Sequence, residues 1–171
     1  MAPGGPRRVV LGIGNPDRGD DGAGRTVARL LRPQLPSDIE VAEHDGEATD
    51  LLARLEGAAA AYLVDACATG APAGTVYRFD VGATPLPQSR FGASTHGYGL
   101  AEAIELGRAL GQLPRRCVVY AIEGGSFELG APLSRPVDVA AADVARRLRA
   151  EIADATGHSP LNRPLIRITL I

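Results

Sequence analysis

Short apolar runs that alternate with helical patterns constrain this chain more than any other feature of its sequence. Runs typical of buried strands lie at 9–13, 39–42, 60–64, 74–79 and 116–122, and the run at 74–79 alternates like an edge strand. Amphipathic helical patterns lie at 23–31, 50–55, 97–110 and 137–152. Strands that alternate with helices favour βαβ crossovers and a sheet covered on both faces. The pattern predicts an α/β fold, a three-layer α/β/α sandwich with a mostly parallel central sheet of about five strands.

Length and composition predict a single domain. The chain has 171 residues, of which 45% are hydrophobic and 22% are charged, and a chain of this size can bury its own core. We expect one domain over 1–171, with a core at about 8–155 and a C-terminal tail at 160–171. The last seven residues, 165–171, have a strand-like pattern that is compatible with an added edge strand, an ordered arm or a flexible tail.

Charge, hydropathy and cysteine content exclude several classes of protein. The net charge is −2 and no run of like charges is present, which argues against a nucleic-acid partner or an acidic membrane surface. No apolar stretch approaches the roughly 18 residues of a membrane span, and the start of the chain does not resemble a signal peptide. Cys67 and Cys117 are far apart and are interpreted as small buried hydrophobes. We therefore expect a cytoplasmic protein.

Acidic residues and one histidine border the predicted strands at the edge where such sheets bind ligands. They are Asp20 and Asp21 after the first strand, Asp45 after the second, Asp65 after the third, and His96 at the start of the following helix. Carboxylate oxygens with one imidazole suit nickel, zinc or cobalt. With only three protein ligands, the metal would keep open coordination positions. A metal needs an open position if it is to polarise a carbonyl or activate a water. The sequence thus predicts a divalent metal site at this edge.

Each acidic residue also has a structural interpretation. One of Asp20 and Asp21 is expected to cap the helix that follows, because aspartate accepts the free N–H groups of a helix N-terminus. Asp45 is compatible with an Asx turn at its glycine neighbour, and Asp65 with a structural role at a strand end. Glu123 lies on the same edge and is expected to orient a loop.

The histidines and one glycine pair have alternatives as well. His96 is compatible with a helix cap or a solvent-facing side chain, and His44 and His158 are expected to be ordinary surface residues. Gly12 and Gly14 resemble the start of a dinucleotide-binding fingerprint, but the third glycine is misplaced. The acidic pair that follows would repel a pyrophosphate, so a nucleotide site is disfavoured.

Five ordered motifs carry a resemblance to a known family. They are GIGNPDRGDDGAG at 12–24, VDA at 64–66, STHGYGL at 94–100, VYAIE at 119–123 and LS at 133–134. In these motifs, over roughly residues 8–150, the chain closely resembles the [NiFe]-hydrogenase maturation proteases. The resemblance implies an aspartic-type, cytoplasmic α/β/α endopeptidase that removes the C-terminal extension of the hydrogenase large-subunit precursor after nickel insertion.

The resemblance also implies a set of site residues. Asp21, Asp65 and His96 would be metal ligands and part of the catalytic site, and Asp45 would be the general base. Many members have glutamate where this chain has Asp21. The nickel would be supplied by the substrate, so that the isolated site is empty or binds another divalent cation, and a monomer is expected. The alternative is a non-catalytic, nickel-sensing chaperone that binds the large subunit on the same scaffold.

Overall fold

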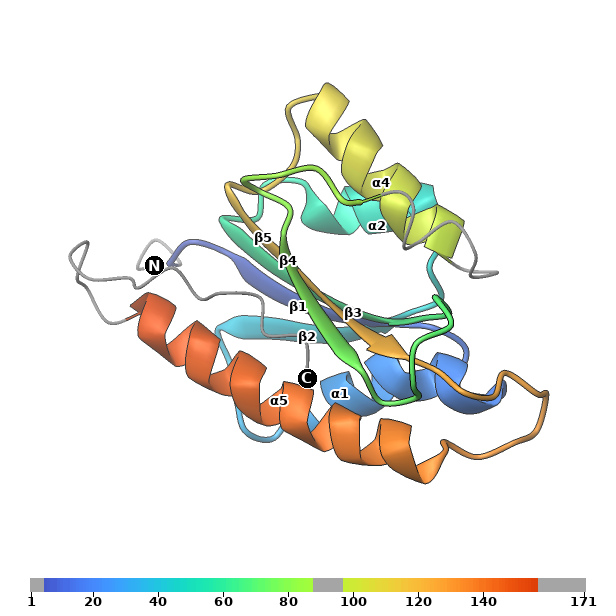
Figure 1. The fold of residues 1–171 in the computed structure, drawn as a ribbon. Helices are drawn as coiled ribbons and strands as arrows, with labels where there is room; N and C mark the ends of the chain where they lie inside the picture. Colours follow the sequence, from blue (N-terminus) through green and yellow to red (C-terminus); the bar gives the residue numbers. More distant parts are fainter. Residues whose placement is uncertain (1–4, 88–96, 157–171) are drawn as a thin grey trace.

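A mostly parallel sheet forms the middle layer of the molecule (Figure 1). The computed structural model describes residues 5–87 and 97–156. In this part of the chain the strands are β1 (Arg8–Ile13), β2 (Ile39–His44), β3 (Ala60–Cys67), β4 (Val76–Asp80) and β5 (Arg116–Glu123). Their order across the sheet is β2-β1-β3-β5-β4. Only the β4–β5 pair of this sheet is antiparallel, so the α/β prediction and the edge position of β4 are confirmed.

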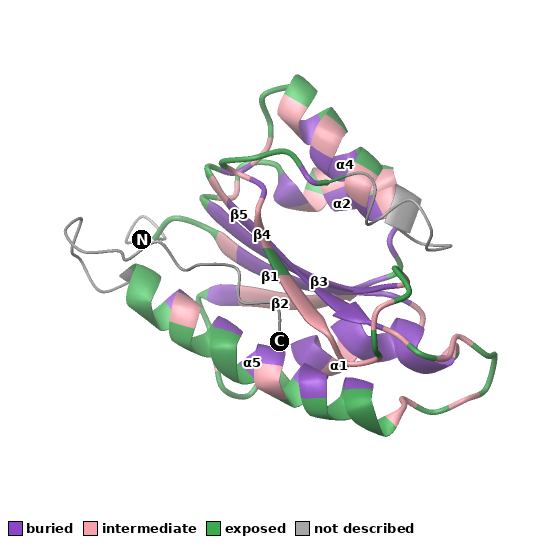
Figure 2. Cartoon of the chain, in the orientation of Figure 1, coloured by how far each residue is buried: buried purple, intermediate pink, exposed green. Residues whose placement is uncertain are grey.

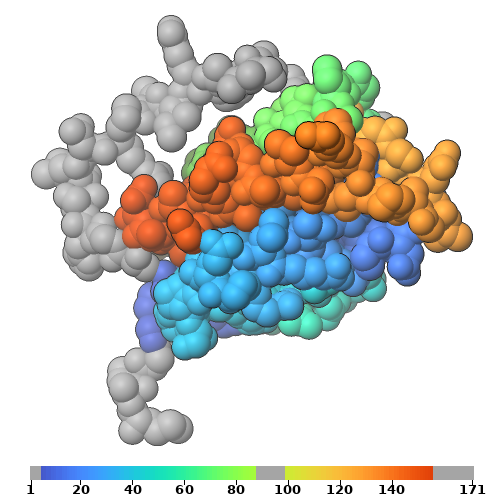
Figure 3. All heavy atoms as spheres, turned by 90° about the horizontal axis from the view of Figure 1, so that it is seen from below, coloured from blue at the N-terminus to red at the C-terminus, as the bar shows by residue number. Residues whose placement is uncertain are grey.

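Helices cover both faces of the sheet, which gives the three layers predicted from the sequence. One face carries α1 (Ala23–Leu31) and α5 (Arg135–Thr156), which lie side by side in the space-filling view (Figure 3). The other face carries α2 (Ala48–Leu55) and α4 (Gly97–Ala109) (Figure 1). A short 3-10 helix, η1 (Gly19–Gly22), leads directly into α1.

The alternation of side chains along each strand divides the core into two parts. Val10 and Tyr62 pack toward α1 and α5, whereas Leu11 and Leu63 pack toward α2 and α4. The buried central strands are purple along most of their length in Figure 2. Because each buried aliphatic or aromatic side chain contributes about 1.5–3 kcal/mol, these two parts of the core stabilise the sheet from which the loops at its carboxyl edge extend.

Several elements extend beyond the ranges that the sequence pattern predicts, among them β3, α2 and α5. β3 continues through Cys67, because its last three residues pair with the end of β5. α2 begins at Ala48 rather than at residue 50, since both carboxylate oxygens of Glu47 accept backbone N–H groups of the first turn. α5 runs over Arg135–Thr156 instead of 137–152.

The expectations about membrane spans, cysteines and the C-terminal tail can be compared with the structure as well. No helix in residues 5–87 or 97–156 is long and apolar enough to cross a membrane. Cys67 and Cys117 are both buried in the core, which confirms their interpretation as small buried residues, and burial raises the pKa of the Cys117 thiol to about 12. The tail at 160–171 and His158 lie outside the described residues.

Candidate active site

Two buried aspartates lie near each other at the carboxyl edge of the sheet. Asp65 is on β3. It directly follows Val64, which forms the last β1–β3 pair with Gly12. Asp21 is in η1, which returns the chain from β1 to this edge. The negative charge of Asp21 acts on Asp65 and, after burial, contributes to its raised pKa, as expected for two nearby carboxylates. The structure therefore brings together two of the three predicted metal ligands.

Glycines of the 12–24 motif allow this approach. A Cβ atom at Gly14, where φ is +132°, would lie 1.8 Å from the Asp21 carbonyl oxygen. One at Gly24 would lie 2.2 Å from the carbonyl oxygen of Val64. The start of α1 therefore packs directly on the strand ends, as only glycine permits. The Asn15 N–H then donates a hydrogen bond to Oδ2 of Asp21 (3.0 Å).

Asp65 has the most unusual surroundings of the predicted residues that the structure describes. Its side chain is 0% exposed. Oδ1 accepts the Ala66 N–H (2.8 Å), but Oδ2 is buried without a hydrogen-bond partner. Burial, followed by the charge of Asp21, raises the pKa of Asp65 to about 7. An unpartnered buried carboxylate oxygen beside a second carboxylate is a suitable donor pair for a divalent cation.

Asp20 has a different role from the helix cap that we predicted for one of the two aspartates. The N-cap residues of η1 and α1 are Arg18 and Gly22, and neither helix has a side-chain cap. Asp20 instead accepts four hydrogen bonds from the β5–α5 loop, donated by the backbone N–H groups of Gly125, Ser126 and Ser134 and by the Ser134 hydroxyl. Burial acts to raise the pKa of Asp20, but these bonds together lower it. Asp20 thus fixes this loop beside its neighbour Asp21.

Glu123 orients a loop, as the sequence predicts. Its carboxylate accepts hydrogen bonds from the N–H groups of Thr69 and Gly70 and from the Thr69 hydroxyl, at 2.7–2.9 Å. The Cys67 thiol donates a further bond to the same carboxylate. Glu123 is 1% exposed, so it is a structural acid that fixes the segment after β3.

Asp45 forms the Asx turn that the sequence suggests. Its Oδ1 accepts the Glu47 N–H (3.1 Å), and its side chain is 75% exposed. The hydrogen bond from the Glu47 N–H is the largest cause of the lowered pKa of Asp45. Asp45 is therefore ionised at neutral pH and accessible to a substrate.

His44 corrects the prediction of an ordinary surface residue. It is 4% exposed and both ring nitrogens make hydrogen bonds. The Gly46 N–H donates to Nδ1 (2.8 Å), and Nε2 lies 2.7 Å from Oδ2 of Asp50 in α2. The sequence gives little indication of this, because the partners of a histidine at a strand end depend on the turn that follows.

The described residues contain no group of three possible metal-binding side chains. His96, the third predicted ligand, lies outside them. It directly precedes Gly97, the first residue of α4. A Cβ atom at Gly99 would lie 2.0 Å from the carbonyl oxygen of Gly46, so the start of α4 contacts the turn that contains Asp45.

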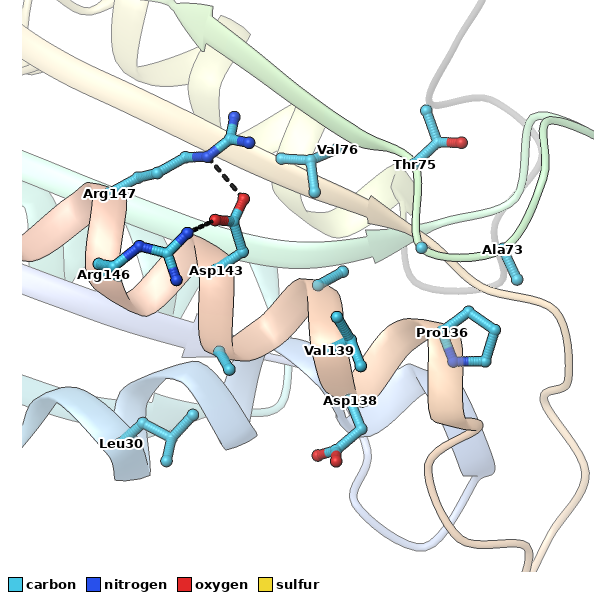
Figure 4. Close-up of a pocket in the computed structure, with 13 residues that line it drawn as sticks. Leu30, Ala73, Thr75, Val76, Pro136, Asp138, Val139, Asp143, Arg146 and Arg147 are labelled. Atoms are coloured by element: carbon cyan, nitrogen blue, oxygen red, sulfur yellow. Dashed lines mark hydrogen bonds and ion pairs between the residues drawn. The ribbon is translucent and has the colours of Figure 1, made fainter. Parts of the chain in front are cut away.

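A hollow elsewhere on the surface is unrelated to these residues. It lies between α5 and the segment that leads into β4, where Ala73 and Val76 face Pro136 and Val139 (Figure 4). None of Asp21, Asp45 and Asp65 lines it. The candidate site is therefore an edge of the sheet and not this hollow.

The family of this protein is defined by its similarity to known proteins. The sequence model of the hydrogenase maturation proteases matches residues 26–151, and the chain belongs to this family. No curated protein sequence matches the chain. Family membership gives the protein a role in hydrogenase maturation and the class of a protease.

Solved structures agree on the fold. The hydrogenase maturating endopeptidase HybD from Escherichia coli is 23% identical, with a TM-score of 0.68 over 88% of this chain and 94% of that one. An endopeptidase from Escherichia coli gives 21% identity and a TM-score of 0.74 over 87% and 94%. The [NiFe] hydrogenase maturation protease HycI from Thermococcus kodakarensis gives 25% identity and a TM-score of 0.65 over 86% and 92%.

Proposed function

We propose that this protein is the endopeptidase that removes the C-terminal extension of a [NiFe]-hydrogenase large-subunit precursor after nickel has been inserted. One observation supports this most strongly: Asp21 and Asp65 lie together at the sheet edge, and Oδ2 of Asp65 is buried without a partner. A protease of hydrogenase maturation that has two carboxylates suited to a cation can recognise the metal of its client directly.

The proposed ligands are Asp21, Asp65 and His96. The position of His96 in the chain supports its inclusion, because α4 begins at the next residue and contacts the Gly46 turn. The nickel of the precursor, when bound, would polarise the scissile carbonyl beside it. Asp45 would act as the general base: it is ionised and exposed, and its turn contacts α4.

The electrostatics of the site supply a reason for acting only on a metal-loaded client. Without a cation, burial and Asp21 hold the pKa of Asp65 at about 7, so much of Asp65 is protonated at neutral pH. A cation favours the ionised carboxylate and relieves the repulsion between the two acids. A precursor without nickel offers neither anchor nor electrophile. We propose further that the protein acts in the cytoplasm as a monomer, and that nickel or zinc ions alone can enter the site.

The test is the mass of the large subunit before and after incubation. Wild-type protein is expected to shorten the nickel-loaded precursor from the same organism at its C-terminus, and to leave the nickel-free precursor intact. Asp21→Asn, Asp65→Asn and His96→Ala should fold and fail to cut. Asp154→Asn, a matched substitution at an exposed position of α5, should cut like the wild type.

Two results would contradict the proposal. Near wild-type cleavage by the three site variants would remove the assigned residues, and equal cleavage of nickel-free precursor would remove the dependence on nickel. A stable complex with nickel-loaded precursor whose mass never changes would instead identify a nickel-sensing chaperone on the same scaffold.

A further inference from the structure

We infer that His44 is a positioning residue for the proposed reaction: its imidazole holds the peptide of Gly46, and thereby sets the place of both Asp45 and the start of α4. The inference rests on the proposed function, because Asp45 is the proposed general base. The His44 ring joins the end of β2 to the Gly46 turn and to the first turn of α2, with one hydrogen bond to each.

The donors around the ring define its protonation. The Gly46 N–H donates to Nδ1, so Nδ1 has no proton and acts as the acceptor. The proton of the neutral ring is then on Nε2, which donates it to Oδ2 of Asp50. Asp50 is held in turn, because its own N–H donates to Glu47, the N-cap of α2. The ring, Asp50 and Glu47 therefore enclose the turn that contains Asp45.

The backbone of His44 is fixed independently of its ring. The His44 carbonyl oxygen accepts the N–H of Gly14 (3.0 Å) and Nε of Arg25 (3.3 Å). Nε of Arg25 also donates to the Gly14 carbonyl oxygen (2.6 Å). The ends of β1 and β2 are thus joined before the turn begins. Because the backbone is held in this way, the ring acts on the residues that follow it, and above all on Gly46.

Gly46 passes this constraint to two parts of the site. Its φ of +95° is a conformation that glycine adopts readily. Its carbonyl oxygen belongs to the next peptide unit, and a Cβ atom at Gly99 would approach this oxygen to 2.0 Å, so a change in the backbone angles of Gly46 would displace the first turn of α4. On its other side is Asp45, whose Oδ1 is 3.6 Å from Nδ1 of His44. One hydrogen bond therefore aligns the proposed base with the element that follows His96.

A pair of substitutions separates the two bonds of the ring. In His44→Asn the amide oxygen takes the approximate place of Nδ1 and can still accept from Gly46, but the bond to Asp50 is lost. In His44→Gln the amide nitrogen takes the approximate place of Nε2 and can still donate to Asp50, but the acceptor for Gly46 is lost. His44→Leu loses both bonds. Two readouts apply to this series: cleavage of nickel-loaded precursor, and hydrogen exchange of the Gly46 amide.

The expected order follows from the Gly46 bond. His44→Asn should keep kcat within about threefold of wild type, whereas His44→Gln and His44→Leu should lose about 10- to 100-fold in kcat with KM nearly unchanged. The Gly46 amide should be protected from exchange in wild type and His44→Asn only. Nickel ions, which we propose can enter the site, should raise the melting temperature of wild type and of all three variants, because Asp21 and Asp65 remain.

The outcomes of the two readouts are distinct. Equal kcat and equal Gly46 protection throughout the series would overturn the inference while the proposed function stands. If wild type fails to cut the nickel-loaded precursor, the proposed function fails, and the protection of Gly46 still decides whether His44 holds this turn. Loss of activity in His44→Asn equal to that in His44→Gln would show that the Gly46 bond is not what sets the activity, and would also overturn the inference.

Discussion

Asp65→Asn should change the stability of the metal-free protein in a way that depends on pH. The unfolding free energy of the variant, relative to that of wild type, should be higher at pH 8 than at pH 5. Burial and the charge of Asp21 raise the pKa of folded Asp65 from 3.8 to about 7. In the unfolded chain the carboxyl ionises near its ordinary value. Between about pH 4 and 7 the folded state thus binds more protons than the unfolded state, so wild-type stability falls as pH rises through this window.

The size of the effect follows from the same shift. One pKa unit corresponds to about 1.4 kcal/mol, so raising the pH from 5 to 8, through the pKa of about 7, costs wild type about 3 kcal/mol of unfolding free energy, most of it below pH 7. The amide that replaces the carboxyl in the variant does not titrate. Its buried NH₂ group lacks a partner and costs about 1–3 kcal/mol, but equally at both pH values. The difference between the variant and wild type should therefore shift by about 3 kcal/mol between pH 5 and 8.

Urea unfolding at pH 5 and pH 8 in the presence of a chelator measures this difference. Asp154→Asn reports the effect of the same substitution at an exposed site of α5. A difference between Asp65→Asn and wild type that is the same at both pH values would refute the proposed electrostatics. So would a variant that loses stability relative to wild type as the pH rises.

Three other perturbations test neighbouring parts of the site. Asp20→Asn should lower the free energy of unfolding by about 2–4 kcal/mol. The contribution of Asp20 is present above about pH 4 and disappears as the pH falls, since the pKa of folded Asp20 lies below 3.8; urea unfolding equal to wild type at pH 7 would contradict this. Gly99→Ala would normally stabilise a helix, but its Cβ would meet Gly46, so we expect a loss of at least about 2 kcal/mol by thermal unfolding and not a gain. Asp45→Asn should reduce the rate of precursor cleavage by about 10²–10⁴-fold while the stabilisation by nickel ions persists, as a base and not a ligand would behave; loss of that stabilisation would make Asp45 a ligand.

The layered fold was predictable because burial on both faces of a parallel sheet leaves continuous apolar runs. Val9–Ile13 and the β5 run show this pattern without interruption. The end of β3 was harder to predict, because aspartate is disfavoured in strands. Asp65 stays in the strand since its backbone pairs with Ala121 on β5. The contact that decides its structure is thus 56 residues away in the chain.

The same distinction separates the site residues that were predictable from those that were not. The acids at strand ends indicate a cation site because the topology gathers such ends at one edge. Asp20 could not be distinguished from a helix cap, since its partners in the β5–α5 loop lie 105–114 residues away. The burial of His44 depends on the Gly46 and Asp50 bonds, which no hydrophobic pattern indicates.

Anomalous diffraction from crystals of the protein with nickel tests the central proposal most directly. A single cation should lie within about 2.0–2.2 Å of carboxylate oxygens of Asp21 and Asp65 and of an imidazole nitrogen of His96. A nickel ion bound at other side chains, with these three residues apart, would contradict the account.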